Sequence, residues 1–165
     1  MQNPSMTVFD RRAVRRNRER AAQGFAAHDF LAREAAGRIA ERLDAVRRPF
    51  PRVLELGGGN GALTSAIAGR PGTEYLAVSD LSLEFARQAR PPAQATVVAD
   101  EELLPFAPAS FDLVASSLTL HWVNDLLGAL AQIKGVLRPG GLFLGALFGA
   151  GTLTELRQAL LQAES

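Results

Sequence analysis

The pattern of apolar and polar positions predicts five short strands that alternate with helices. Apolar, often β-branched runs bounded by glycine, proline or acidic residues predict strands at residues 53–56, 74–80, 95–99, 111–117 and 142–148. Apolar residues at helical spacing predict helices at 29–46 and 125–137; in the first helix, one face carries Leu31, Ala35, Ile39, Leu43 and Val46. This alternation predicts an α/β fold, a doubly wound parallel sheet with strand order 3-2-1-4-5.

Turn and capping residues place the ends of the later elements. Arg138-Pro139-Gly140-Gly141 is expected to end the helix at 125–137 with a turn. Thr152-x-x-Glu155 has the form of a capping box and predicts a last helix that runs to the end of the chain. Prolines after residue 48 separate an N-terminal helical extension, residues 1–48, from the sheet domain, residues 49–165.

The N-terminal extension is rich in arginine. After a start at 1–9 that is expected to fray, a helix predicted at 10–22 carries Arg11, Arg12, Arg15, Arg16, Arg18 and Arg20, and Asp10 can cap it. Residues 1–50 hold 11 arginines against 6 acidic residues, whereas residues 51–165 hold 7 basic against 11 acidic residues. The helix is either a basic patch for an acidic partner, RNA or an anionic membrane, or a solvated face; no aromatic residues are interleaved for base stacking.

Composition narrows the chemistry. The chain has no cysteine and only two, isolated histidines, so the sequence offers neither a thiolate nucleophile nor a histidine-rich metal site, and no ligand cluster for iron. A net charge of +1 argues against wholesale nucleic-acid binding. No apolar run is long enough to cross a bilayer.

A glycine-rich turn after the first strand is the strongest candidate binding site. Glu55 ends an apolar run, and Gly57, Gly59 and Gly61 follow at alternate positions before a helix. Glycines there allow positive φ and close approach of a ligand, and the carboxylate of Glu55 suits an ammonium group. Gly57, Gly59 and Ala62 also satisfy the loose dinucleotide fingerprint, although a carboxylate would repel a pyrophosphate. An ordinary strand–helix turn without a ligand is the third interpretation.

Acidic residues end the second and third strands. Asp80 follows Gly61 by 19 positions, where a carboxylate can accept two ribose hydroxyls, and Leu81 beside it can cover an adenine. Asp80 can instead cap the helix that follows, a role that Ser82 can also fill. Asp100, with Glu101 beside it, is placed to accept an adenine amino group; alternatively, these acids are solvated loop charges.

The fourth strand ends near a histidine. His121 and Trp122 follow it where a doubly wound fold faces its substrate, and Ser116 near the end of the strand is a further candidate cofactor contact. His121 is either a base or substrate contact, or a ring that is hydrogen-bonded beside a packing tryptophan. The spacing Glu55-x-Gly57-x-Gly59-x-Gly61 resembles the first motif of class I S-adenosylmethionine-dependent methyltransferases.

Longer runs extend this resemblance. VFDRRAVRRNRERAA, ADEELLPFAPASFDLVASSLTLHWVNDLLGAL and LRPGGLFLGALFGAGTLTELRQALLQAE resemble the complex I assembly factor 5 family of arginine hydroxylases and its bacterial relatives. Biotin-pathway carboxyl methyltransferases are similar but more distant. Gly58 is cysteine in many relatives. In the methyltransferases that the chain resembles, the sheet has two more strands after the fifth. We therefore expect this chain to be the N-terminal portion of a longer protein. We also expect it to self-associate through residues 142–148.

The resemblance implies S-adenosylmethionine as cofactor and methyl transfer to an unidentified acceptor. It also implies an alternative, hydroxylation of an arginine on a complex I subunit. A third hypothesis is a non-catalytic binding module whose arginine-rich helix contacts a membrane or a partner; a fourth is a nicotinamide-dependent oxidoreductase. No nucleic-acid partner is expected. The expected compartment is the bacterial cytoplasm, with peripheral membrane contact through the arginine-rich helix, or the mitochondrial matrix in a eukaryote.

Overall fold

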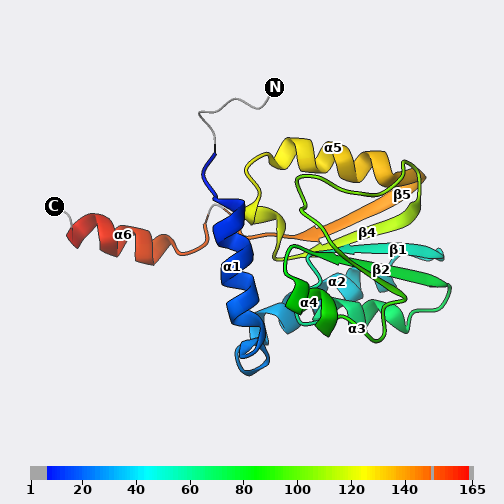
Figure 1. Cartoon of the computed structure of the whole chain (residues 1–165), viewed down its shortest axis with the longest axis horizontal. Coiled ribbons are helices and arrows are strands. Elements are labelled where there is room, and N and C mark those ends of the chain that lie inside the picture. Colours follow the sequence, from blue (N-terminus) through cyan, green and yellow to red (C-terminus); the bar gives the residue numbers. More distant parts are fainter. Residues whose placement is uncertain (1–6, 150, 164–165) are drawn as a thin grey trace.

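A five-stranded parallel sheet forms the centre of the computed structural model, which describes residues 7–149 and 151–163 (Figure 1). The strands are β1 (Arg52–Leu56), β2 (Tyr75–Asp80), β3 (Ala95–Val98), β4 (Phe111–Ser117) and β5 (Leu137–Ala146). Their order, β3-β2-β1-β4-β5, confirms the predicted order. The chain reverses its direction of winding at β1, which pairs with β2 on one side and β4 on the other. The carboxyl ends of β1 and β4 therefore form the crevice where such folds bind ligands.

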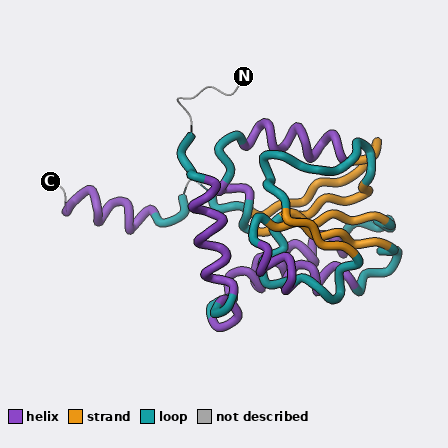
Figure 2. Tube along the Cα trace, in the orientation of Figure 1, coloured by secondary structure: helices purple, strands orange, loops and turns teal. Residues whose placement is uncertain are grey.

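Helices cover both faces of the sheet because its strands are apolar on both sides. On one face, Ile39 of α2 (Phe30–Asp44) and Ile67 of α3 (Ala62–Ala68) pack in one cluster with Val53 of β1. On the other face, Ile133 of α5 (Leu126–Val136) packs in a second cluster with Leu54. Figure 2 shows helices on both sides of the strands. α4 (Leu83–Gln88) and the 3-10 turn η3 (Leu120–Trp122) follow β2 and β4.

Helix α1 (Arg11–Ala22) lies against the end of the sheet where β2 and β3 finish. Asp10 caps it as predicted, since its carboxylate accepts from the Arg12 N–H at 2.9 Å. A 3-10 turn, η2 (Phe25–Ala27), connects it to α2. Most of the expected frayed start, residues 1–6, lies outside the described residues. The predicted domain boundary at residue 48 stays a prediction.

Three details of the sequence analysis are wrong. Leu31 does not join the buried face of α2; it is 41% exposed because it lies in the first turn, at the rim of a cavity. Arg138-Pro139-Gly140-Gly141 does not form a turn after α5 but lies inside β5, where a register shift opposite Phe111 and Leu113 accommodates the extra residues. The last helix, α6 (Thr154–Ala163), begins two residues after Thr152, because Leu153 adopts a φ of +58°.

Helix α6 stands away from the rest of the protein (Figure 1). None of its described residues is buried, and Leu156, Leu160 and Leu161 are exposed. In the part of the chain that the structure describes, no helix is both long enough and apolar enough to span a membrane.

Candidate cofactor site

The glycine turn after β1 adopts the backbone conformation that its glycines permit. Gly57, Gly59 and Gly61 have φ values of +72°, +53° and +81°, in the left-handed region. The Gly57 N–H donates to the Ser79 carbonyl at 2.8 Å, which ties the turn to β2. A Cβ on Gly57 would lie 2.0 Å from Thr119 Oγ1, so no larger residue fits there. The turn therefore brings bare backbone to the crevice between β1 and β4.

Glu55 lies at the base of this crevice. Its side chain is 1% exposed, and its Oε2 accepts from the Thr64 hydroxyl at 2.7 Å. Burial, supported by the charge of Asp80 and opposed by the bond from Thr64, raises the pKa of Glu55 to about 8. In the described part of the chain, no lysine or arginine lies within ion-pair distance of the Glu55 carboxylate. Glu55 is therefore a buried carboxyl that a bound cation would ionise.

Asp80, at the end of β2, is fully buried and accepts four hydrogen bonds. Two come from backbone N–H groups: Gly59 to Oδ2 at 3.0 Å and Ser82 to Oδ1 at 2.8 Å. The other two come from Arg18 of α1, through Nε to Oδ1 at 3.1 Å and through Nη2 to Oδ2. The helix cap of α4 is Ser82, whose Oγ accepts from the Phe85 N–H, so Asp80 does not fill that role.

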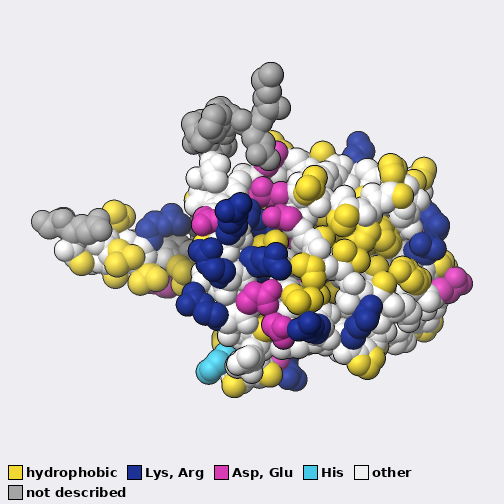
Figure 3. All heavy atoms as spheres, in the orientation of Figure 1, with side chains coloured by type: hydrophobic (Ala, Val, Ile, Leu, Met, Phe, Trp, Pro, Cys, Tyr) yellow, Lys and Arg dark blue, Asp and Glu magenta, His cyan; other side chains and the backbone are white. Residues whose placement is uncertain are grey.

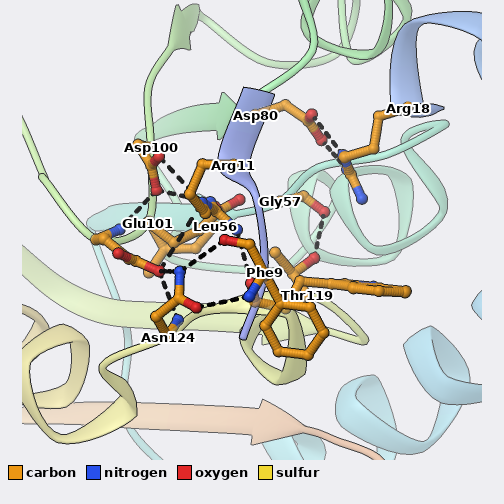
Figure 4. A network of polar contacts seen from close by, with 12 residues as sticks. Phe9, Arg11, Arg18, Leu56, Gly57, Asp80, Asp100, Glu101, Thr119 and Asn124 are labelled. Atoms are coloured by element: carbon orange, nitrogen blue, oxygen red, sulfur yellow. Dashed lines mark hydrogen bonds and ion pairs between the residues drawn. The ribbon is translucent and has the colours of Figure 1, made fainter. Parts of the chain in front are cut away.

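Asp100 and Glu101 also bind an arginine of α1. The Arg11 guanidinium donates to Asp100 at 3.1 and 2.6 Å and also to Glu101 (Figure 4). It donates a further hydrogen bond to the Trp122 carbonyl. Burial raises the pKa of Glu101, and the charge of Arg11 opposes that rise. Figure 3 shows basic side chains over α1 interleaved with acidic ones. The arginines of α1 therefore do not form a single exposed patch, because Arg11 and Arg18 bind acidic residues of the protein itself.

A cavity of about 340 Å³ opens beside the glycine turn. This volume is within the range of small-molecule sites. Its polar lining includes Glu55, the backbone of the glycine turn, Thr119 and His121, and its remaining walls are largely apolar, formed by Phe25, Phe30, Leu31, Phe85, Trp122 and Phe148. These residues come from β1 and the glycine turn, from η3, from η2 and the start of α2, from α4 and from the segment after β5. Distant parts of the sequence therefore converge at the predicted crevice.

The ring of His121 lines this cavity and carries an unpaired nitrogen. Its Nδ1 is buried and has no hydrogen-bond partner among the described residues. The ring lies 4.6 Å from the ring of Phe148 and 5.4 Å from that of Trp122. Burial, and then the charge of Arg18, lowers the pKa of His121, which favours the neutral imidazole. A neutral, unpaired imidazole nitrogen can accept a proton or a hydrogen bond.

The structure brings some of the predicted site residues together and separates others. Glu55, Gly57, Gly59 and His121 line the cavity, whereas Asp80, Asp100 and Glu101 lie under α1 and bind its arginines. Three predicted residues contribute elsewhere: Ser116 Oγ donates to the Leu56 carbonyl at 3.1 Å, Leu81 is buried, and Gly61 precedes α3 and lines a neighbouring groove.

The sequence patterns placed Arg11 and Arg18 in a basic patch but did not predict their acidic partners within the protein, and they did not single out Thr119. The two arginines are seven positions apart, so they lie on one face of a helix, and this spacing is a signal that one face of the basic helix is directed inward. Thr119 carries no sequence signal, because its role depends on the close approach of Gly57.

Comparison with known proteins identifies relatives by sequence. Residues 54–145 match the family described as "Methyltransferase domain". Arginine-hydroxylase NDUFAF5, mitochondrial, from Danio rerio is 43% identical over 164 residues, covering 96% of this chain and 50% of the relative. Malonyl-[acyl-carrier protein] O-methyltransferase from Xylella fastidiosa (strain M23) is 37% identical over 165 residues, covering 96% of this chain and 56% of the relative. The chain thus spans about half the length of these curated relatives.

A solved structure with the same fold is N-methyltransferase NodS from Bradyrhizobium japonicum WM9, in complex with S-adenosyl-L-homocysteine. It superposes with a TM-score of 0.62 at 22% identity, over 77% of this chain and 71% of that one. At this identity the likeness shows the shared fold alone.

Proposed function

We propose, from the premise that the chain belongs to the methyltransferase-domain family, that it binds S-adenosylmethionine beside the glycine turn and transfers a methyl group to an acceptor. The observation that carries the proposal is Glu55. It is a buried carboxyl without a cation partner among the described residues, next to a glycine turn that bulkier residues cannot form. The methionine part of the cofactor has an ammonium group that would complete this site.

Different residues of the site would bind different parts of the cofactor. Glu55 would bind the ammonium, and Gly57 and Gly59 would let the ligand lie against backbone. Asp80 would accept from the ribose hydroxyls, and Asp100 and Glu101 from the adenine amino group, with Leu81 packing beneath. Ser116 would hold the start of the glycine turn through its bond to Leu56. Each of these assignments is a proposal.

The bound cofactor supplies a methyl group on a positively charged sulfur. The protein then mainly has to align an acceptor, and such positioning can supply roughly 7–11 kcal/mol of the barrier. His121 is the residue we propose to take a proton from the acceptor, because its ring lines the cavity and burial favours the neutral imidazole. The apolar side chains around it would exclude water from the reaction.

The names of the relatives point to two reactions and two acceptors. One relative is named as an arginine-hydroxylase, the other as an O-methyltransferase of malonyl-[acyl-carrier protein]. We propose methylation and a protein-borne acceptor, with a complex I subunit as the finer proposal; a mass gain of one oxygen instead of one methylene would favour hydroxylation. The relatives named as mitochondrial support a mitochondrial location if the chain is eukaryotic. We propose the matrix in that case, and the cytoplasm if the chain is bacterial.

The outer face of α1 supports a second proposal, contact with an acidic partner or membrane surface. Arg12, Arg15, Arg16 and Arg20 are exposed there. Reversing the charge of Arg15 and Arg16 should abolish binding to anionic vesicles or to the partner at low salt. Unchanged binding would leave these arginines as a solvated face.

Calorimetric titration tests the cofactor proposal. We expect S-adenosylmethionine to bind, NAD not to bind, and Glu55→Ala to weaken binding of S-adenosylmethionine strongly while circular dichroism stays unchanged. Binding of NAD instead, or binding of S-adenosylmethionine that ignores Glu55, would contradict the proposal.

A further inference from the structure

Asp80 has no hydrogen-bonding capacity to spare. A carboxylate offers about four lone-pair sites, and the four donors from Gly59, Ser82 and Arg18 account for that number. The Gly59 and Ser82 donors are backbone N–H groups fixed by the glycine turn and the start of α4. The two donors of Arg18 are the only ones of the four that a side-chain rotation can remove. A second ligand can therefore reach Asp80 only at the expense of Arg18.

We propose that Arg18 is a gate residue: a ligand with a vicinal diol, such as the ribose of an adenosyl compound, binds Asp80 only after Arg18 has left it. This inference rests on the proposed function. It names a positioning residue that acts through Asp80, and it predicts that the guanidinium competes with the ligand.

The surroundings of Arg18 allow its side chain to move while the helix stays in place. Glu19 holds α1 on α4 by accepting from the Leu83 and Glu84 N–H groups at 2.8 and 3.3 Å, and Gln88 Nε2 donates to the Ala22 carbonyl at 3.0 Å. These contacts do not involve Arg18. The gate is therefore the side chain and not the whole helix.

Arg18 also has space to move into. It lines the cavity beside the glycine turn and a second groove of about 210 Å³ along α1, between Val14, Ala21 and Trp122. Its guanidinium lies 5.0 Å from the centre of the Phe85 ring, a contact that can continue after the ion pair opens. Rotation of the side chain would thus open a path from the cavity to Asp80.

Titration with S-adenosylhomocysteine tests the gate with two matched variants. Arg18→Gln removes the charge and the fork of donors, whereas Arg16→Gln makes the same change on the exposed face of the same helix. We expect Arg18→Gln to bind the ligand about tenfold more tightly than the wild type, which corresponds to about 1.4 kcal/mol. Arg16→Gln should bind like the wild type. Arg18→Lys, which keeps a charge but loses the fork, should fall between them.

A second readout separates the gate from a general loosening of the helix. Amide hydrogen exchange of α1 should stay slow in Arg18→Gln, since Glu19 and Gln88 still hold the helix. Equal or weaker binding by a folded Arg18→Gln would overturn the gate. Rapid exchange throughout α1 in that variant would overturn it too, because the whole helix would then be the moving part. Failure of every variant to bind would instead contradict the proposed function, and the gate with it.

Discussion

Glu55 makes folding stability depend on pH. Its pKa rises from an ordinary value of 4.5 to about 8 in the folded chain, mainly through burial. The protonated form is therefore favoured in the folded state. The resulting stabilisation is complete below the ordinary pKa and is lost as the pH rises through about 8.

The change Glu55→Gln tests this dependence. The glutamine cannot ionise, so the variant should lose less stability than the wild type between about pH 5 and 9, by on the order of 3–5 kcal/mol. Urea unfolding of both proteins at the two pH values measures the difference. If the free energies of unfolding of the wild type and the variant differ by the same amount at both pH values, Glu55 titrates normally and the prediction is wrong.

Gly57 offers a steric prediction at the same scale. An alanine there would place Cβ 2.0 Å from Thr119 Oγ1 at a φ of +72°, so Gly57→Ala should destabilise the fold by about 2–4 kcal/mol. The control is Gly37→Ala in the interior of α2, where nothing lies within 4 Å of the new methyl group. It should stabilise by about 0.5–1 kcal/mol. Equal thermal stabilities of the two variants would contradict the strain at Gly57.

Single residues were the easier part of the site to predict. Glu55 and the glycines are neighbours in sequence, so their spacing alone indicates a turn with a carboxylate beside it. Asp80 and Asp100 follow from the rule that strand ends meet at one edge of a sheet. The pairing of these acids with Arg11 and Arg18 was not predicted, because the partners lie 89 and 62 residues apart. The spacing of the two arginines indicates a shared helix face but not what that face binds.

At the scale of elements, α1 depends on its N-terminal anchor. Arg11 connects it to the acidic residues after β3 and to the Trp122 carbonyl, and the neighbouring Phe9 N–H donates to Asn124 at 2.8 Å (Figure 4). Removal of the guanidinium would leave Glu101, which is 3% exposed, without its cation. The position of the first turn of α1 therefore depends on Arg11.

Arg11→Gln tests this anchor against Arg12→Gln, which changes an exposed neighbour. Loss of charged hydrogen bonds worth about 1.5–3 kcal/mol should speed amide exchange in the first turns of α1 by about tenfold or more in the Arg11 variant. The Arg12 variant should exchange like the wild type. Equal exchange in both variants would show that other contacts hold the helix.

Strands and helices were predicted better than the segments that join them. Apolar runs indicated all five strands, and helical periodicity indicated the helices at 29–46 and 125–137. The segment Arg138-Pro139-Gly140-Gly141 was predicted to be a turn because proline and glycine are common in turns. Only pairing with β4, with its register shift, makes this segment part of a strand. Tertiary contacts that override local preference explain this error.

At the scale of the molecule, apolar surface remains exposed after β5 and on α6. β5 borders the sheet, and Leu147, Phe148, Leu156 and Leu160 beyond it are exposed. An open edge strand and exposed leucines each favour association of copies. We predict that this chain self-associates in light scattering at high concentration, and that Leu156→Lys with Leu160→Lys reduces the association. A clean monomer at high concentration would contradict this prediction.

Glu55 and the cavity that it lines are the centre of the proposed cofactor site. A ligand ammonium would ionise this carboxyl, so binding of S-adenosylmethionine should release about one proton per site near pH 6.5. Calorimetry in two buffers of different ionisation enthalpy measures that proton directly. We predict release by the wild type and none by Glu55→Gln, which should bind more weakly. Binding without proton release, equally tight in both proteins, would contradict the role of Glu55 and the cofactor site built around it.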